Sequence, residues 1–249
     1  MQKIEAEKIR THVRFLAHDL LEGRGTGQRG GDIAAEYIAT QFALYGLKPA
    51  AAGGTYMQKV PMVGITPASE TTFAFVPNQG EARSLKHLDE YVAYDQTQQV
   101  ESDIDAGIVF VGYGIDAPEY KWDDYKGADV KGKVLLMLVS EPPSDDGQFF
   151  TGKALTYYGR WTYKYEQAAR KGAVGAILIH KTDMASYPWE VVRNSNSGEK
   201  SYLKLEGSRK LKVAAWVQLE VARELVSNAG LNLDKLMTEA RSRDFHPVS

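Results

Sequence analysis

The chain has 249 residues, of which 43% are hydrophobic and 25% charged, a composition typical of folded globular proteins and unlike that of disordered or fibrous ones. Its 30 basic and 32 acidic residues leave a formal charge of -2, so no overall field attracts nucleic acid or an anionic membrane surface. The absence of cysteine excludes disulfides, thiolate zinc sites and cysteine nucleophiles.

Two features bear on the cellular location. The longest apolar runs, among them 134–139 and 176–179, are far shorter than the ~20 residues that a membrane-spanning helix needs. The chain begins with a polar stretch where a secretory signal would have an apolar core of roughly 7–15 residues. The sequence therefore predicts no membrane span, and either a cytosolic protein or an exported one whose signal has been removed.

The first predicted element is an amphipathic helix. Steps of four, three and four residues separate the apolar residues Ile9, Val13, Leu16 and Leu20. This spacing places them on one face of a helix. A second helix is predicted with Asp32 as its N-cap and Gly46 as its stop. Its apolar residues are Ile33, Tyr37, Ile38, Phe42 and Tyr45.

The loop between these helices contains GTGQRG (25–30), which fits the dinucleotide-binding pattern G-x-G-x-x-G. That fingerprint follows a buried strand and is itself followed, ~20 residues later, by an acidic residue for the ribose. Here a helix precedes the glycines and the later stretch reads LKPAAAGG. Nucleotide binding is therefore rejected unless residues 9–22 form a strand. The glycines are expected to supply positive φ angles in a tight connection: Gly23, Gly25, Gly27 and Gly30.

Four polar residues alternate with these glycines: Glu22, Arg24, Thr26 and Arg29. A tight turn does not require them, and binding residues are often found on loops. They are candidates for facing a cleft or a partner.

Short β-like runs follow at 58–64, 71–77 and 90–95. Stronger strand candidates come later, at 107–114, 133–140, 176–181 and 213–217. An aromatic pattern through Tyr157, Trp161 and Tyr165 predicts a helix over 157–171 between the second and third of these. A strand, a helix and a strand predict parallel pairing with a right-handed crossover and a sheet covered on both faces. Two further helices are expected at 219–230 and 231–242.

The aromatic cluster 157–165 is expected to be mostly core. Three of its residues are predicted to face solvent or a partner: Tyr158, Arg160 and Tyr163.

Catalytic and metal-binding patterns are not evident. The five histidines form no His-x-x-x-His pair, and His12 and His18 diverge around a helix. His180 closes an apolar strand, so it is either a buried, hydrogen-bonded residue or one that faces a cleft. The acidic pairs 123–124 and 145–146 are expected to be exposed loop charge. A calcium loop from residue 103 fails because Gly114 occupies the position of its bidentate Glu, and no Ser lies in a G-x-S-x-G turn.

A family resemblance accounts for the polar loop residues. The segment FLAHDLLEGRGTGQRGGDIAAEYIATQFALYGLKP (15–49) resembles the opening of the two-zinc aminopeptidases, which are related to the glutamate carboxypeptidases and the transferrin receptor. The family signature L-x-x-D-x-L-E-G-R-x-x-G-x-x-G is matched by Leu16, Asp19, Leu21, Glu22, Gly23, Arg24, Gly27 and Gly30. In that family the loop lies near the active-site side of the fold.

Two further segments, 112–143 and 171–180, resemble the protease-associated domain that many of these enzymes carry as an insertion. The resemblance implies an α/β fold: a swivelling β/β/α protease-associated domain, with an open barrel-like sheet and flanking helices, plus an N-terminal helical pair. It also implies a helical segment of a peptidase domain (1–60), the protease-associated domain (61–230) and a return segment toward a catalytic domain (231–249).

The family's zinc ligands and general base follow the inserted domain, and none of them is matched here. We therefore expect a non-catalytic part of a metallo-aminopeptidase, exported to the periplasm or the extracellular space and soluble. The parent enzyme would use two zinc ions and a peptide substrate, while this chain would carry no cofactor and be inactive alone. The inserted domain would act as a substrate-restricting lid or an interaction module.

The alternative is a stand-alone peptide- or protein-binding module that uses the exposed residues of 157–163. If the chain is a fragment, the apolar residues of its leading helices would pack in a makeshift way, sit partly exposed or pair with another copy. These residues are Ile9, Val13, Ile38 and Phe42.

Overall fold

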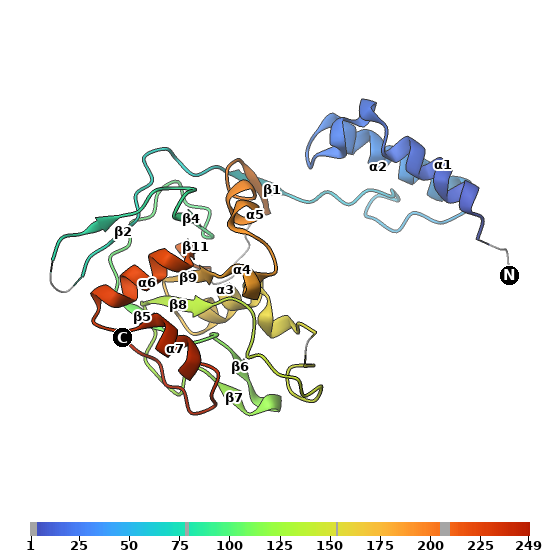
Figure 1. Cartoon of the computed structure of the whole chain (residues 1–249). Coiled ribbons are helices and arrows are strands. Elements are labelled where there is room, and N and C mark those ends of the chain that lie inside the picture. Colours follow the sequence, from blue (N-terminus) through green and yellow to red (C-terminus); the bar gives the residue numbers. More distant parts are fainter. Residues whose placement is uncertain (1–3, 78–79, 153, 205–209) are drawn as a thin grey trace. The chain divides into compact units, whose positions relative to one another are not determined.

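The computed structural model describes residues 4–77, 80–152, 154–204 and 210–249. The chain forms two compact units, Met1–Met62 and Val63–Ser249 (Figure 1). Of the described residues, no helix is long and apolar enough to cross a membrane.

The first unit contains α1 (Ala6–Leu16), the 3-10 segment η1 (Asp19–Arg24) and α2 (Arg29–Leu44). The first helix ends at Leu16, so Leu20 belongs to η1 and is exposed, contrary to the sequence pattern. The second helix begins at Arg29 with Gln28 as N-cap, so the prediction of Asp32 as N-cap is wrong. Asp32 lies in the first helical turn, where its negative charge interacts favourably with the positive end of the helix dipole.

Aromatic contacts join α1 to α2. The rings of Phe15 and Tyr37 stack with centroids 4.2 Å apart. The two ring nitrogens of His12 lie 2.9 and 3.1 Å from the hydroxyls of Tyr37 and Tyr45. The apolar faces of these helices are largely uncovered, because Ile9, Val13, Ile38 and Phe42 are between 40% and 55% exposed. Of the three arrangements expected for these four apolar residues, the first unit shows partial exposure.

The second unit is built on a five-stranded sheet in the order β4-β11-β9-β8-β5. Its strands are β4 (Tyr91–Tyr94), β5 (Ile108–Phe110), β8 (Val134–Leu138), β9 (Gly175–His180) and β11 (Val213–Gln218). The last four pair in parallel, and β4 is antiparallel to β11. The predicted parallel pairing of the apolar runs is therefore confirmed. Within the described residues, the sheet ends at β4 and β5 and does not close into a barrel.

Three small two-stranded sheets accompany it within the described residues. They pair β1 (Met62–Ile65) with β10 (Lys200–Leu203), β2 (Ala74–Phe75) with β3 (Arg83–Ser84), and β6 (Asp116–Ala117) with β7 (Trp122–Asp123). A 3-10 turn, η2 (Pro118–Tyr120), connects β6 to β7.

Helices cover both faces of the large sheet. One core joins alternate strand residues, such as Leu136, to α6 (Leu219–Asn228) and α7 (Leu233–Glu239). The other joins the intervening residues, such as Leu135, to α3 (Trp161–Arg170) and α5 (Trp189–Asn194). This alternation explains why the strands read as continuous apolar runs. The short helix α4 (Thr182–Ala185) follows β9.

The helix predicted over 157–171 begins only at Trp161. Residues Tyr157–Gly159 form the 3-10 segment η3, capped by the side chain of Thr156, and Arg160 is extended at the start of α3. The buried face of α3 includes Tyr165, whereas Tyr157 and Trp161 are 51% and 43% exposed. The aromatic periodicity therefore spans two elements with different buried faces.

Residues 231–249, expected as a return segment, belong to the second unit. Helix α7 contributes Leu233, Leu236 and Met237 to its core. Further on, the backbones of Phe110 and Val248 exchange two hydrogen bonds of 2.8 and 3.0 Å beside the edge strand β5.

Candidate functional site

The glycines of the loop 19–31 serve two structural purposes. Gly23 and Gly27 have positive φ angles of 76° and 70°, as expected. Gly25 has a φ of -55° and Gly30 is helical, so the expectation of a positive φ at these two positions is wrong. Gly30 is required by a close approach instead, because a Cβ there would lie 1.7 Å from the carbonyl oxygen of buried Leu21.

The polar residues of this loop are all exposed. Glu22 and Arg24 are not glycines, yet they have φ angles of 51° and 57°, a conformation that costs free energy and that clusters at functional sites. The Arg29 guanidinium donates a hydrogen bond of 2.9 Å to the Glu22 carboxylate. The side chains of Arg24 and Thr26 form no hydrogen bond or ion pair with the described residues. The loop therefore brings Glu22 and Arg29 together and leaves two polar side chains free.

The second predicted group lies around η3 in the other unit. The Tyr158 hydroxyl donates a hydrogen bond of 2.6 Å to Glu119, and Arg160 is exposed. Tyr163 was expected to face solvent or a partner, and this is wrong because it is only 3% exposed. Its ring packs edge-on against Tyr157 and Tyr158, and its hydroxyl lies 3.1 and 3.2 Å from the backbone N and O of Asp116.

One pair of ionisable residues was not anticipated. Asp124 was expected to be exposed loop charge, but it is buried, and its carboxylate accepts hydrogen bonds of 2.9 Å from the Ile115 backbone N–H and the Trp122 indole. Lys164 is also buried, and its ammonium has no hydrogen-bond partner among the described residues. Burial raises the pKa of Asp124 and lowers that of Lys164, while their mutual attraction opposes both shifts.

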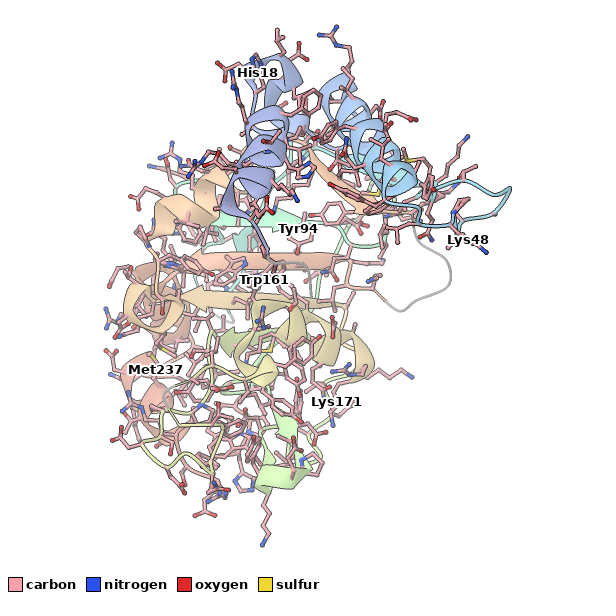
Figure 2. The ribbon with its side chains drawn as sticks, turned by 90° about the vertical axis from the view of Figure 1, so that its right-hand side faces the viewer. His18, Lys48, Tyr94, Trp161, Lys171 and Met237 are labelled. Atoms are coloured by element: carbon pink, nitrogen blue, oxygen red, sulfur yellow. The ribbon has the colours of Figure 1, made fainter. Side chains whose placement is uncertain are left out.

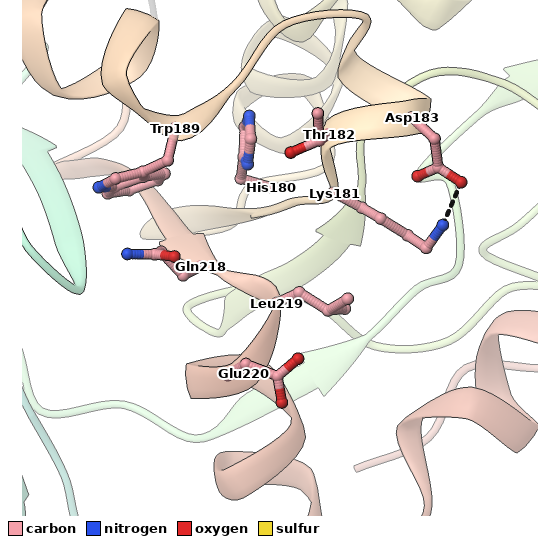
Figure 3. Close-up of a pocket in the computed structure, with 8 residues that line it drawn as sticks. All are labelled: His180, Lys181, Thr182, Asp183, Trp189, Gln218, Leu219 and Glu220. Atoms are coloured by element: carbon pink, nitrogen blue, oxygen red, sulfur yellow. Dashed lines mark hydrogen bonds and ion pairs between the residues drawn. The ribbon is translucent and has the colours of Figure 1, made fainter.

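A pocket of about 490 Å³ lies at the carboxyl ends of two neighbouring parallel strands (Figure 3). His180 ends β9, Gln218 ends β11, and the two residues are paired in register. In open α/β sheets, ligands commonly bind outside the carboxyl ends of the strands. The pocket is lined by His180, Lys181, Thr182, Asp183, Trp189, Gln218, Leu219 and Glu220.

The charges around this pocket are largely paired. Lys181 forms an ion pair with Asp183, drawn as a dashed line in Figure 3, and Glu220 pairs with Arg223. His180 lies 3.0 Å from the Tyr187 carbonyl through Nε2, which must therefore carry the hydrogen. Burial lowers the pKa of His180, which favours the neutral imidazole. The pocket thus suits a neutral polar ligand better than an ion.

Both readings of His180 hold, since it is buried and hydrogen-bonded and also lines the pocket. Sequence reasoning missed Trp189 and Gln218. A usable signal existed for Gln218, which directly follows the apolar run 213–217 at a strand end. Trp189 is positioned by tertiary structure, through an indole hydrogen bond of 2.9 Å to the Leu88 carbonyl.

Among the residues that the structure describes, no three His, Cys, Asp or Glu side chains gather as a metal site. Comparison of the chain with models of protein families, with curated proteins and with solved structures gave no match.

Proposed function

We propose that this chain is a non-catalytic N-terminal part of a zinc-dependent aminopeptidase, an enzyme that removes N-terminal residues from peptides. In this proposal the first unit belongs to the peptidase domain. The second unit is a protease-associated domain of the β/β/α type that restricts access of the peptide substrate or binds a partner. The parent would be exported, with its signal removed.

The observation that carries the proposal is the conformation of the loop 19–31. The apolar and glycine positions of its signature have structural reasons, as shown by buried Leu21 and by Gly30 packed against it. Those reasons do not cover Glu22 and Arg24, which are exposed and held at positive φ. Strained, exposed charged residues at the signature's own positions support a role near an active site.

The uncovered faces of α1 and α2 are a second support. Ile9, Val13, Ile38 and Phe42 lie on helices whose amphipathic pattern calls for a partner surface. Large exposed apolar patches mark surfaces that contact other polypeptide. A peptidase sheet would provide such a surface.

Two zinc ions are assigned to the parent enzyme, where they would bind the substrate's amino terminus and activate water. The described residues of this chain do not fit a zinc site, since they offer no cluster of three ligands. No zinc ligand and no catalytic step are therefore assigned to this chain.

The test is to express this chain together with any coding sequence that follows Ser249 in the gene, and to assay hydrolysis of an aminoacyl anilide with and without a chelator. Chelator-sensitive hydrolysis is expected. Arg24→Gln should lower this activity, whereas Arg14→Gln on the exposed last turn of α1 should not. A stop codon directly after Ser249, or a hydrolysis rate that the chelator does not change, would overturn the proposal.

A second candidate function is that of a stand-alone peptide- or protein-binding module. The exposure of Leu155, Tyr157 and Trp161 on one stretch of the second unit favours it. Titration of peptides against tryptophan fluorescence tests this function, and the absence of any saturable change would argue against it.

A further inference from the structure

A second pocket, of about 230 Å³, lies in the second unit beside the edge strand β4. Figure 2 labels two of its walls, Tyr94 from β4 and Trp161 from the start of α3. The other lining residues are Tyr187, Val191, Val192, Ser195, Asn196, Lys200 and Trp216. These residues come from β4, α3, α5, β10, β11 and the connections between them.

The aromatic walls are held by their neighbours. The Tyr94 ring stacks on Tyr202 at 5.8 Å and meets Tyr165 edge-on at 6.3 Å. Trp161 meets the same Tyr165 ring at 5.9 Å, while its outer part remains exposed. A rigid aromatic surface binds an apolar group at a low cost in conformational entropy.

Among the described residues that line this aromatic pocket, Lys200 is the cationic one. The Lys200 ammonium donates a hydrogen bond of 2.6 Å to the Asn196 side-chain oxygen and lies 5.2 Å from the centre of the Tyr94 ring. Asn196 is itself anchored by a hydrogen bond of 2.6 Å to the Val192 carbonyl. Two contacts, with the Asn196 side chain and with the Tyr94 ring, therefore fix the position of the Lys200 ammonium.

The Lys200 ammonium has N–H donors that form no hydrogen bond with the described residues. An ammonium has three N–H donors, and one of them is taken by Asn196. No carboxylate of the described residues forms an ion pair with Lys200, in contrast to Lys171 and Lys181, each of which pairs with an aspartate. Burial lowers the pKa of Lys200 because it disfavours the charged ammonium. An anion beside Lys200 would favour the charged form again.

We propose that this pocket binds a carboxylate that is attached directly to an apolar or aromatic side chain, as in the C-terminal residue of a peptide or a free amino acid derivative. The side chain lies between Trp161 and Tyr94, and the carboxylate accepts a hydrogen bond from Lys200. A volume of about 230 Å³ is below the ~300–1,000 Å³ of sites for drug-sized ligands and suits one side chain. This inference goes beyond the proposed function and does not depend on it.

The test uses the full chain and three probes: a short peptide ending in phenylalanine with a free carboxylate, the same peptide as its C-terminal amide, and N-acetylphenylalanine. Binding is followed by tryptophan fluorescence, because Trp161 and Trp216 line the pocket. The free-acid peptide is expected to bind saturably and the amide about tenfold or more weakly, because the amide cannot form the charged hydrogen bond to Lys200. If N-acetylphenylalanine binds as tightly as the free-acid peptide, a single residue with a free carboxylate is enough to occupy the pocket. This result would also support the site.

Two variants place the binding site. Lys200→Met should weaken the acid about tenfold and remove its preference over the amide, while Trp161→Ala should weaken acid and amide alike. Lys181→Met, at the other pocket, is the matched control and should leave binding unchanged. Since Trp161 is partly exposed, its variant keeps the test valid if Lys200→Met fails to fold. Equal affinity for acid and amide, no binding of any probe, or loss of binding only in Lys181→Met would overturn the proposal.

Discussion

Lys164 and Asp124 are the least exposed charged side chains described in the second unit. The Lys164 ammonium lies 5.9 and 5.8 Å from the ring centres of Tyr113 and Tyr163, and Asp124 supplies its main attraction. Taking two charges out of water costs several kcal/mol per ion, which their attraction repays only in part. Removing one member therefore leaves the other as a buried charge without its main attraction.

Lys164→Met is predicted to make stability fall more steeply as pH rises than it does in the wild type. Burial already raises the pKa of Asp124 above its unfolded value of 3.8, so the folded state holds this proton more tightly and stability falls as pH rises between the two values. Without Lys164 the pKa of Asp124 rises further. Between about pH 5 and about pH 8 the variant should lose about 3 kcal/mol or more of its free energy of unfolding, a larger loss than in the wild type, measured by urea unfolding.

The matched control is the double variant Asp124→Asn, Lys164→Met, which has no ionisable group at this place and should lack this loss between the two pH values. If Lys164→Met itself were equally stable at both, the Asp124 carboxylate would be solvated and the argument from burial would fail.

Gly30 and Gly27 provide a second residue-scale prediction. A Cβ at Gly30 would overlap the Leu21 carbonyl oxygen, whereas one at Gly27 would meet nothing within 4 Å and would bear only the cost of its φ of 70°. Gly30→Ala should cost about 1–3 kcal/mol or more and Gly27→Ala about 1–2 kcal/mol. Amide hydrogen exchange in α2 measures both, and faster exchange in the Gly27 variant than in the Gly30 variant would contradict the assignment.

At the scale of elements, Arg83 joins three of them. Its guanidinium, on β3, donates hydrogen bonds of 2.6 and 2.8 Å to Glu90 just before β4, and two of 3.0 Å to Glu224 on α6. Hydrogen bonds from Arg83 are the main reason why the pKa of Glu90 falls from 4.5 to about 2. A carboxylate with a lowered folded pKa stabilises the protein above its unfolded pKa and loses that contribution as pH falls toward the folded value.

The thermal midpoint is therefore predicted to fall between about pH 4.5 and about pH 2, and to fall less steeply in Arg83→Met. At neutral pH this variant should lose about 1–2 kcal/mol, because the site is partly exposed and the charged hydrogen bonds are weakened by solvent. Lys235→Met, which removes an exposed pair with Glu239, is the control and should change stability by no more than about 0.5 kcal/mol. Equal pH profiles for Arg83→Met and the wild type would refute the role of Glu90.

The elements that sequence predicts well are those whose burial is uniform. The runs 133–140 and 176–181 are apolar on both sides because helices cover both faces of the sheet, and they become β8 and β9. The start of α3 was misplaced because Tyr157 and Trp161 fit a helical period while tertiary structure puts a 3-10 turn and an extended Arg160 between them.

Sites follow the same logic. The polar loop around Glu22 is contiguous in sequence, and its unusual residues could be singled out there. The aromatic pocket joins Tyr94, Trp161, Lys200 and Trp216, which meet only because β4 pairs with β11 and α3 packs on the same face. No local pattern encodes such a meeting, and sequence reasoning therefore missed it.

At the scale of the whole molecule, the two units differ in how much they bury. Both core clusters are drawn from residues 73–248. Among the described residues of the first unit, only Leu21, Gly30 and Ala34 are buried. Since burial of apolar surface is the main source of stability, the first unit should be much less stable than the second.

This difference is directly measurable, because all four tryptophans lie in the second unit: Trp122, Trp161, Trp189 and Trp216. Tryptophan fluorescence therefore follows only the second unit, whereas far-UV circular dichroism also follows α1 and α2. In a urea titration, part of the helical signal is predicted to disappear before the fluorescence changes, because the first unit unfolds at a lower denaturant concentration. Residues 63–249 expressed alone should give the same fluorescence midpoint as the full chain and lack the early helical change. A lower midpoint for the shorter chain, or coincident transitions in the full chain, would show that the first unit contributes to the stability of the second.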